Sequence, residues 1–138
     1  RQDIDYVKKV NSEIDSLQFP NDKENEIWAK IQLFLSEYSN ARIQIISPEH
    51  IETYQVEPLV YYITKVKYYN HFDIIIKVKT IGYKDYNLEE FNKKALIHYL
   101  LTNEANQKII GCNLPECRNL IADPNNYKSS NYDINKPR

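Results

Sequence analysis

Cys112 and Cys117 have the most informative spacing of the reactive side chains in this 138-residue sequence. The segment CNLPEC places four residues between them, including Pro115, so a disulfide would close a short loop. In the chain-entropy model, a bridge across so few residues stabilises a fold by about 2 kcal/mol. We expect this disulfide to form. The alternatives are two unrelated reduced thiols or half of a metal or redox site, although the spacing differs from the C-x-x-C of thioredoxin-like proteins.

The three histidines, His50, His71 and His98, are the other side chains that suit a metal ion. A zinc site needs three or four converging His, Cys or carboxylate ligands. These histidines are far apart in the sequence, and nothing in their spacing predicts that they converge. His50 and Glu52 would share one face of a strand, but such pairs are common in strands. We therefore predict no bound metal ion and no cofactor.

The sequence contains no catalytic motif in a recognisable form. Its two glycines, Gly82 and Gly111, supply neither a glycine-rich phosphate loop nor the sharp turn that usually carries a nucleophile. Nineteen acidic residues allow many carboxylate pairs, but the sequence points to none of them. We predict no catalytic residues and a protein that is not an enzyme. The alternative is a small enzyme with a pocket between helices and sheet, lined by His98, Tyr99 and tyrosines of the sheet.

Lysines and aromatic residues alternate in KVKYYNHFDIIIKV, residues 65–78, which is typical of either a nucleic-acid platform or an ordinary hairpin. Two β-rich runs so close in sequence predict an antiparallel hairpin, with strands at about 59–69 and 72–81. We expect a three-residue loop that places Lys67 opposite Asp73, because this register keeps the lysines off the buried face. In that pair, Asp73 would neutralise the positive charge of Lys67. The sequence therefore does not strongly indicate a nucleic-acid-binding surface.

Under this register, the outward side of the hairpin and the tyrosines after it form the predicted partner-binding surface. Tyrosine is enriched at protein interfaces because its large ring ends in a polar group. The predicted buried side contains Val66, Tyr68, Phe72, Ile74 and Ile76. The predicted partner-binding surface contains Tyr61, Lys65, Lys77, Lys79, Tyr83 and Tyr86.

The apolar residues before the hairpin predict two helices and two short strands. Apolar residues recur every three or four positions over 3–17 and again from Glu24, which follows a plausible N-cap at Asp22. These two segments are therefore expected to be amphipathic helices. Residues 42–47 and 50–56 alternate or are β-branched, which favours two strands.

A third helix is expected at about 88–103, where Asn87 and Glu90 form a capping-box-like pair. The predicted fold class is α+β: two N-terminal helices, an antiparallel sheet of about four strands with a long central hairpin, a C-terminal helix and an irregular tail. The helices should cover one face of the sheet. Residues 1–122 are expected to form a single domain, and residues 123–138, rich in Asn and Pro, a mobile tail.

The overall charge argues against partners that are held by long-range electrostatics. Eighteen basic and nineteen acidic residues leave a net charge of −1. No global field therefore draws the chain to a phosphate backbone or an anionic membrane. No apolar run approaches the roughly 20 residues that cross a bilayer as a helix, which predicts no transmembrane segment.

The cysteine pair and the lack of catalytic motifs favour a binding or structural role. The sequence begins at Arg1 and contains no Met, which favours export after removal of a targeting segment, with tag removal or excision from a larger protein as alternatives. The leading hypothesis is a small exported or envelope-associated bacterial protein, periplasmic or lipoprotein-like, whose partner is another protein or an envelope component. The alternative is a cytoplasmic partner-binding protein of the inhibitor or immunity type.

Overall fold

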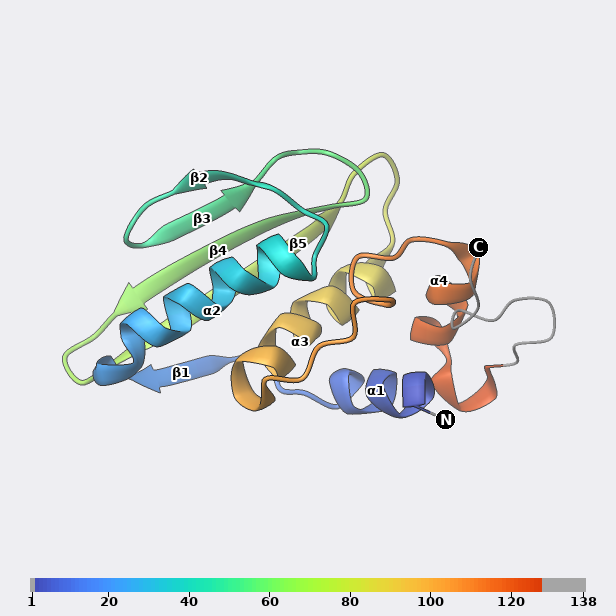
Figure 1. Cartoon of the computed structure of the whole chain (residues 1–138), viewed down its shortest axis with the longest axis horizontal. Coiled ribbons are helices and arrows are strands. Elements are labelled where there is room, and N and C mark those ends of the chain that lie inside the picture. Colours follow the sequence, from blue (N-terminus) through green and yellow to red (C-terminus); the bar gives the residue numbers. More distant parts are fainter. Residues whose placement is uncertain (1, 128–138) are drawn as a thin grey trace.

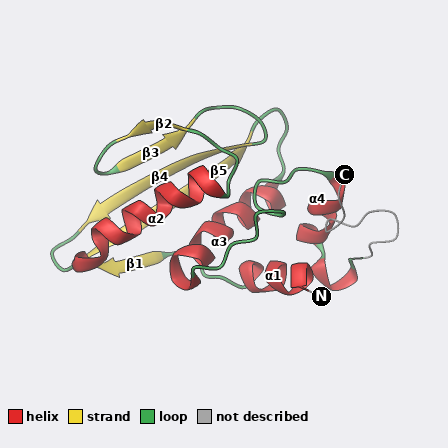
Figure 2. Cartoon of the chain, in the orientation of Figure 1, coloured by secondary structure: helices red, strands yellow, loops and turns green. Residues whose placement is uncertain are grey.

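The β-rich middle of the chain folds into an antiparallel sheet, and the amphipathic segments around it fold into helices (Figures 1 and 2). The computed structural model describes residues 2–127, so most of the predicted tail, at 128–138, lies outside the described residues. In chain order the elements are α1 (Gln2–Asn11), β1 (Leu17–Pro20), a 3-10 turn (Asn21–Lys23), α2 (Glu24–Glu37), β2 (Ile43–Ile46), β3 (His50–Thr53), β4 (Leu59–Lys67), β5 (His71–Thr80), α3 (Tyr86–Thr102), α4 (Pro115–Ala122) and a second 3-10 turn (Pro124–Asn126).

Within residues 2–127 the five strands form one sheet in the order β1-β5-β4-β3-β2, and all neighbouring strands are antiparallel. The hairpin of β4 and β5 lies inside the sheet, while β1 and β2 are its edges. α2 and α3 lie on one face of the sheet, and α1 and α4 pack against α3 (Figure 1). The predicted α+β class, with helices on one face of an antiparallel sheet, is confirmed.

Aromatic and aliphatic side chains fill the layer between helices and sheet. Phe34 of α2, Tyr61 of β4 and Phe91 of α3 are all buried. The rings of Phe34 and Tyr61 meet edge to face, with their centroids 6.4 Å apart. α3 is buried on most sides, because β5, α1, α2 and α4 all contact it. Its apolar residues therefore surround most of the helix instead of following one stripe.

The register of the central hairpin differs from the predicted one by a single residue. Lys67 pairs with Phe72, and the backbone N–H of Tyr68 donates a hydrogen bond to the carbonyl of His71 at 2.8 Å. The turn therefore contains two residues instead of three. The predicted pairing of Lys67 with Asp73 is wrong.

This one-residue shift turns every side chain of β4 to the opposite face, because side chains alternate along a strand. Tyr61, Ile63 and Lys65 face the helices and are buried. Val66 and Tyr68, which were predicted to be buried, face away from the helices, and Tyr68 is half exposed. On β5 the predicted buried residues are confirmed: Phe72, Ile74 and Ile76.

Lys65 is stable inside the core because the first turns of α2 offer its ammonium group two partners. Its side chain is 4% exposed, and its Nζ lies 2.8 Å from Oε2 of Glu24 and 4.4 Å from the centre of the Trp28 ring. Nζ of Lys67 lies 2.8 Å from the other oxygen of the same carboxylate. Hydrogen bonds from Lys65 and Lys67 hold the pKa of Glu24 below its usual value. An anion and an aromatic face thus compensate for the loss of water around the lysine.

The first helix is shorter than predicted, and a strand replaces its expected last turns. α1 ends at Asn11, and Ile14 is 63% exposed. Leu17 begins β1 and pairs with Ile74 of β5. The spacing of Ile14 and Leu17 fits a helix. The edge of β5, however, offers Leu17 backbone hydrogen-bond partners and a position in which its side chain is buried.

β2, β3 and α3 lie where the sequence predicts them, with ends that differ by a few residues, but two capping residues were misassigned. Lys23, the last residue of the 3-10 turn, takes the N-cap position of α2 that was assigned to Asp22. Asp85, and not Asn87, caps α3, and its carboxylate accepts a hydrogen bond from the N–H of Leu88 at 3.1 Å. Asp and Asn are equally good N-caps, so residue type alone does not choose between neighbouring positions.

The structure predicts that Glu24→Gln destabilises the protein through Lys65. The substitution leaves a buried ammonium without an anion, so we expect the free energy of unfolding in urea to fall by about 2 kcal/mol. Lys65→Met keeps the aliphatic stem over Trp28 and should change stability by less than about 1 kcal/mol. In the Lys65→Met background, Glu24→Gln should therefore lower the free energy of unfolding only slightly.

Lys67→Met is the matched control for this prediction. Lys67 shares the carboxylate of Glu24, but its side chain is 52% exposed. Its substitution should shift stability by no more than about 0.5 kcal/mol. An equal cost of Glu24→Gln with and without Lys65 would show that the buried ion pair is not the cause.

Candidate functional site

The predicted disulfide is present and closes a turn in front of α4. Cys112 and Cys117 are bonded through their sulfurs, with their Cα atoms 6.1 Å apart. Pro115 begins α4, which contains Cys117. This short helix was not predicted, because its 8 residues cover only about two turns and give too short a window to establish a period. Disulfides persist in oxidising compartments, so the bridge indicates an oxidising, extracytoplasmic environment.

Two of the six residues predicted for the partner-binding surface are buried. Tyr61 is 0% exposed and Lys65 is 6% exposed, because the shifted register turns both toward the helices. Their assignment to the surface is wrong. Burial also raises the pKa of Tyr61 far above its usual value, so its hydroxyl stays neutral in the core.

Lys77 and Lys79 lie on the face of the sheet that the helices leave uncovered. They are opposite Tyr62 and Val60 of β4, and Ile75, the preceding outward residue of β5, is 54% exposed. Neither lysine forms an ion pair with any residue in the part of the chain that the structure describes. We call the outward side chains of Tyr62, Ile75, Lys77 and Lys79 the open face.

His50 borders the open face on the neighbouring strand β3. Its Nδ1 lies 3.0 Å from the hydroxyl of Thr64, and its Nε2 lies 2.8 Å from Oε1 of Glu52. His50 and Glu52 share one face of the strand, as predicted. Both ring nitrogens already have partners, so neither is free to bind a metal ion. His50 therefore forms a polar border of the open face.

Tyr83 and Tyr86, the last two residues of the predicted surface, are exposed but lie outside the sheet. Tyr83 is in the loop after β5, and its hydroxyl accepts a hydrogen bond from Arg118 of α4 at 2.7 Å. The guanidinium of Arg118 also lies 5.6 Å from the centre of the Tyr83 ring. Tyr83 therefore makes an internal contact with α4, while Tyr86 begins α3 and is 65% exposed.

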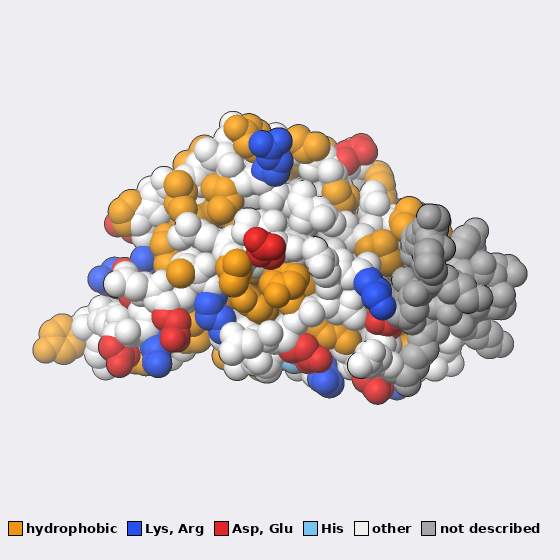
Figure 3. Space-filling view, viewed as in Figure 1, with side chains coloured by type: hydrophobic (Ala, Val, Ile, Leu, Met, Phe, Trp, Pro, Cys, Tyr) orange, Lys and Arg blue, Asp and Glu red, His pale blue; other side chains and the backbone are white. Residues whose placement is uncertain are grey.

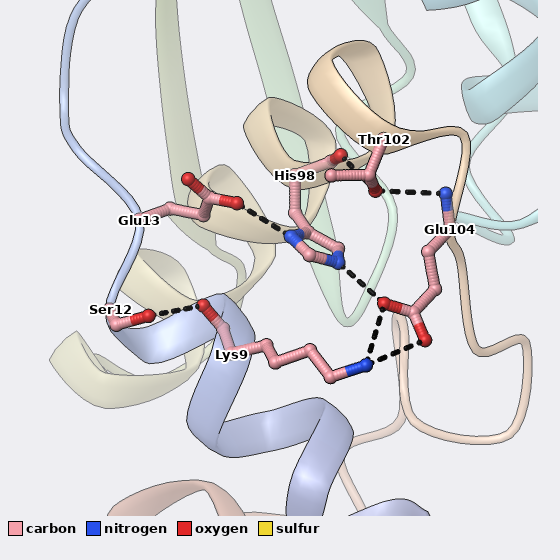
Figure 4. A network of polar contacts seen from close by, with 6 residues as sticks. All are labelled: Lys9, Ser12, Glu13, His98, Thr102 and Glu104. Carbon is pink, nitrogen blue, oxygen red and sulfur yellow. Dashed lines mark hydrogen bonds and ion pairs between the residues drawn. The ribbon is translucent and has the colours of Figure 1, made fainter.

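His98 is buried, and both of its ring nitrogens face carboxylates (Figure 4). Nδ1 lies 2.6 Å from Oε2 of Glu13, and Nε2 lies 2.7 Å from Oε1 of Glu104. Lys9 donates to the same carboxylate of Glu104 at 3.4 Å. The ring donates both bonds when both nitrogens carry a proton. Hydrogen bonds from His98, and then from Lys9, hold the pKa of Glu104 below its usual value.

This network connects three separate parts of the chain. Glu13 follows α1, His98 lies on α3, and Glu104 lies in the loop after α3 (Figure 4). While both bonds are in place, His98 has no free nitrogen to bind a metal ion or to accept a proton from a substrate. The arrangement therefore favours a structural role for His98.

A pocket of about 320 Å³ lies between the loop from α2 to β2 and the loop from β3 to β4. Arg42 comes from the first loop and Glu57 from the second. Both loops lie at the end of the sheet where α2 ends (Figure 1). Sequence reasoning missed this site, because neither loop has a periodic pattern and the order of the strands alone brings them together.

Apolar side chains are also exposed at the β2 edge of the sheet. Figure 3 shows hydrophobic side chains over β2 and β3 on the helix side of the molecule. Ile45 and Ile46 of β2 are 46% and 51% exposed. An uncovered edge strand with apolar side chains is able to pair with another chain.

Within residues 2–127, no group of three or more His, Cys, Asp and Glu side chains is placed to hold a metal ion. Nor does any helix of the described chain have the length and hydropathy needed to span a membrane.

Glu104→Gln should destabilise the protein near neutral pH and matter less as the pH falls. The pKa of Glu104 is lowered in the folded state, so its contribution is present above the carboxylate pKa of the unfolded chain. That contribution is lost as the pH falls through the lower folded value. In urea titrations, the stability difference between wild type and variant should be largest near pH 7 and shrink below about pH 4.

Glu49→Gln is the control, because the carboxylate of Glu49 is exposed and pairs with no cation in the described chain. This variant should follow the wild type at every pH. A difference for Glu104→Gln that does not change with pH would contradict the role of the ionised carboxylate.

Replacing Cys112 and Cys117 together with Ser should lower the free energy of unfolding by about 2 kcal/mol, because the unfolded chain loses its closed loop. Adding a reductant to the wild type should produce the same loss in a urea titration. The double variant should not respond to the reductant. A wild type whose stability is unchanged by complete reduction would contradict this account.

No match was found when the chain was compared with models of known protein families, with curated protein sequences and with solved structures.

Proposed function

We propose that this protein is a small exported or envelope-associated bacterial protein that binds another protein or an envelope component through the open face. Its role is binding and not catalysis. The observation that carries the proposal is the uncovered side of the sheet, where Ile75 and Tyr62 lie beside two lysines that have no partner in the described chain.

The open face combines the two properties that a binding surface needs. Ile75 and Tyr62 offer apolar and aromatic area that a partner can remove from water. Lys77 is opposite Tyr62 in the ladder, and Lys79 follows on the same side of β5. Two uncompensated positive charges favour a partner with an acidic surface and reject a basic one.

The disulfide supports the exported location. Cytoplasmic thiols are kept reduced, whereas bridges persist in secreted and periplasmic proteins. Cys117 is also fully buried, so a reductant reaches the bridge poorly through that sulfur. A protein whose cysteines are bridged in living cells fits an extracytoplasmic compartment.

Photo-crosslinking in cells that express the full-length gene tests the binding surface. A photoreactive phenylalanine at position 75 should give a discrete adduct with one partner, and Lys77→Glu with Lys79→Glu should remove that adduct. The matched control carries the probe at Leu33, which is 45% exposed on the outer side of α2. Equal adducts at both positions, or an adduct that survives charge reversal, would rule out the open face as the specific surface.

Alkylation of thiols in the same intact cells tests the compartment. Cys112 and Cys117 should stay unmodified until the cells are lysed under reducing, denaturing conditions. Thiols that react at once after denaturation without a reductant would contradict export and favour the cytoplasmic inhibitor-type alternative.

A further inference from the structure

The pocket at the end of α2 is a second candidate binding site, separate from the open face. Its volume is about 320 Å³, and small-molecule sites in proteins begin at roughly 300 Å³. None of its lining residues belongs to the open face. The size suits a small molecule.

Hydrogen bonds hold both loops of the pocket in place. The carbonyl of Arg42 accepts a hydrogen bond from the N–H of Tyr54 at 2.9 Å, which ties the two loops together. The hydroxyl of Ser39 accepts from the N–H of Ala41 at 3.0 Å and donates to the carbonyl of Leu35 at 2.6 Å. A site with a fixed backbone loses less entropy when it binds a ligand.

Two glycines support the pocket from outside. Gly111 has a φ of +75°, and a Cβ there would lie 2.5 Å from the carbonyl of Ser39, so only glycine permits this contact. The next residue, Cys112, belongs to the disulfide. At Gly82 a Cβ would lie 2.6 Å from Oε1 of Glu57, so the glycine leaves room for that carboxylate.

One cationic and one anionic residue line the pocket, and they form no ion pair with each other. Arg42 and Glu57 both line it, and neither forms an ion pair with any residue among 2–127. Arginine binds carboxylates through two parallel hydrogen bonds, and glutamate accepts hydrogen bonds from ammonium groups. A ligand that carries both groups would satisfy both side chains.

Apolar surface lies in the same pocket. Leu59 is buried at 3% exposure, while Tyr54 and Val56 are 46% and 63% exposed. Pro58 also lines the pocket. A hydrocarbon or aromatic side chain of the ligand would cover this surface and remove it from water.

We infer that this pocket binds a small zwitterion with an apolar side chain, of the chemical class of a free amino acid. Arg42 binds the carboxylate, Glu57 binds the ammonium, and Tyr54, Val56 and Leu59 receive the side chain. This inference goes beyond the proposed function, because it gives the protein a small-molecule ligand in addition to a macromolecular partner.

NMR titration of the oxidised, full-length chain tests the inference. The probes are L-phenylalanine and L-leucine, with 3-phenylpropionate, which lacks the ammonium, and phenethylamine, which lacks the carboxylate. The amino acids should shift amide signals in residues 39–42 and 54–59. Each charged hydrogen bond should add roughly ten- to hundredfold in affinity, so both truncated analogues should bind that much more weakly.

Charge-removing variants assign each ligand group to one side chain. In Arg42→Gln, L-phenylalanine should bind no better than phenethylamine does to the wild type. In Glu57→Gln, it should bind no better than 3-phenylpropionate does to the wild type. Glu49→Gln, which changes an exposed charge outside the pocket, should leave the affinity unchanged.

Two outcomes would overturn the inference: no shift in either loop with either amino acid, or equal affinity for amino acids and truncated analogues. Failure here is distinguishable from failure of the proposed function. Arg42→Gln and Glu57→Gln should leave the crosslink at position 75 intact, since the pocket and the open face share no residue.

Discussion

The ion pair between Lys65 and Glu24 is the contact on which the arrangement of the sheet depends. Lys65 reaches both Glu24 and Trp28 only when β4 and β5 pair in the observed register. A slip by one residue would move the ammonium to the solvent side and turn Tyr61 out of the core. The contact that joins α2 to β4 therefore also determines which side chains remain on the open face.

Much of the fold follows from local sequence patterns, but the register of the hairpin of β4 and β5 does not. The α+β class, the central hairpin, α2, α3 and the disulfide were predictable, because periodicity and loop length are visible within short segments. The register was predicted from the rule that lysines avoid the core. That rule failed because the partner of Lys65 lies 41 residues earlier in the sequence, where no local pattern reveals it.

The candidate sites also divide into residues that a local pattern places correctly and residues whose position depends on distant parts of the chain. Tyr61 and Lys65 were assigned to the surface as a direct result of the wrong register, whereas Lys77 and Lys79 alternate with buried residues of β5 and so were placed on the outward side of that strand. Arg42 and Glu57 lie in two irregular loops, and the strand order β4-β3-β2 brings these loops to one end of the sheet. The sequence holds no signal for such a meeting, since it arises only after the sheet has formed.

The contacts of α1 have a consequence for the order in which the protein can assemble. Glu13 binds His98, Asp3 accepts a hydrogen bond from Asn106 at 2.9 Å, and Asn11 donates to the carbonyl of Ile121 at 3.4 Å. The ribosome therefore releases α1 before it has made the groups that hold this helix. Because distant contacts form slowly, the first helix must wait for residues 98–121, and segments 85 to 110 residues apart in the sequence close this part of the fold together.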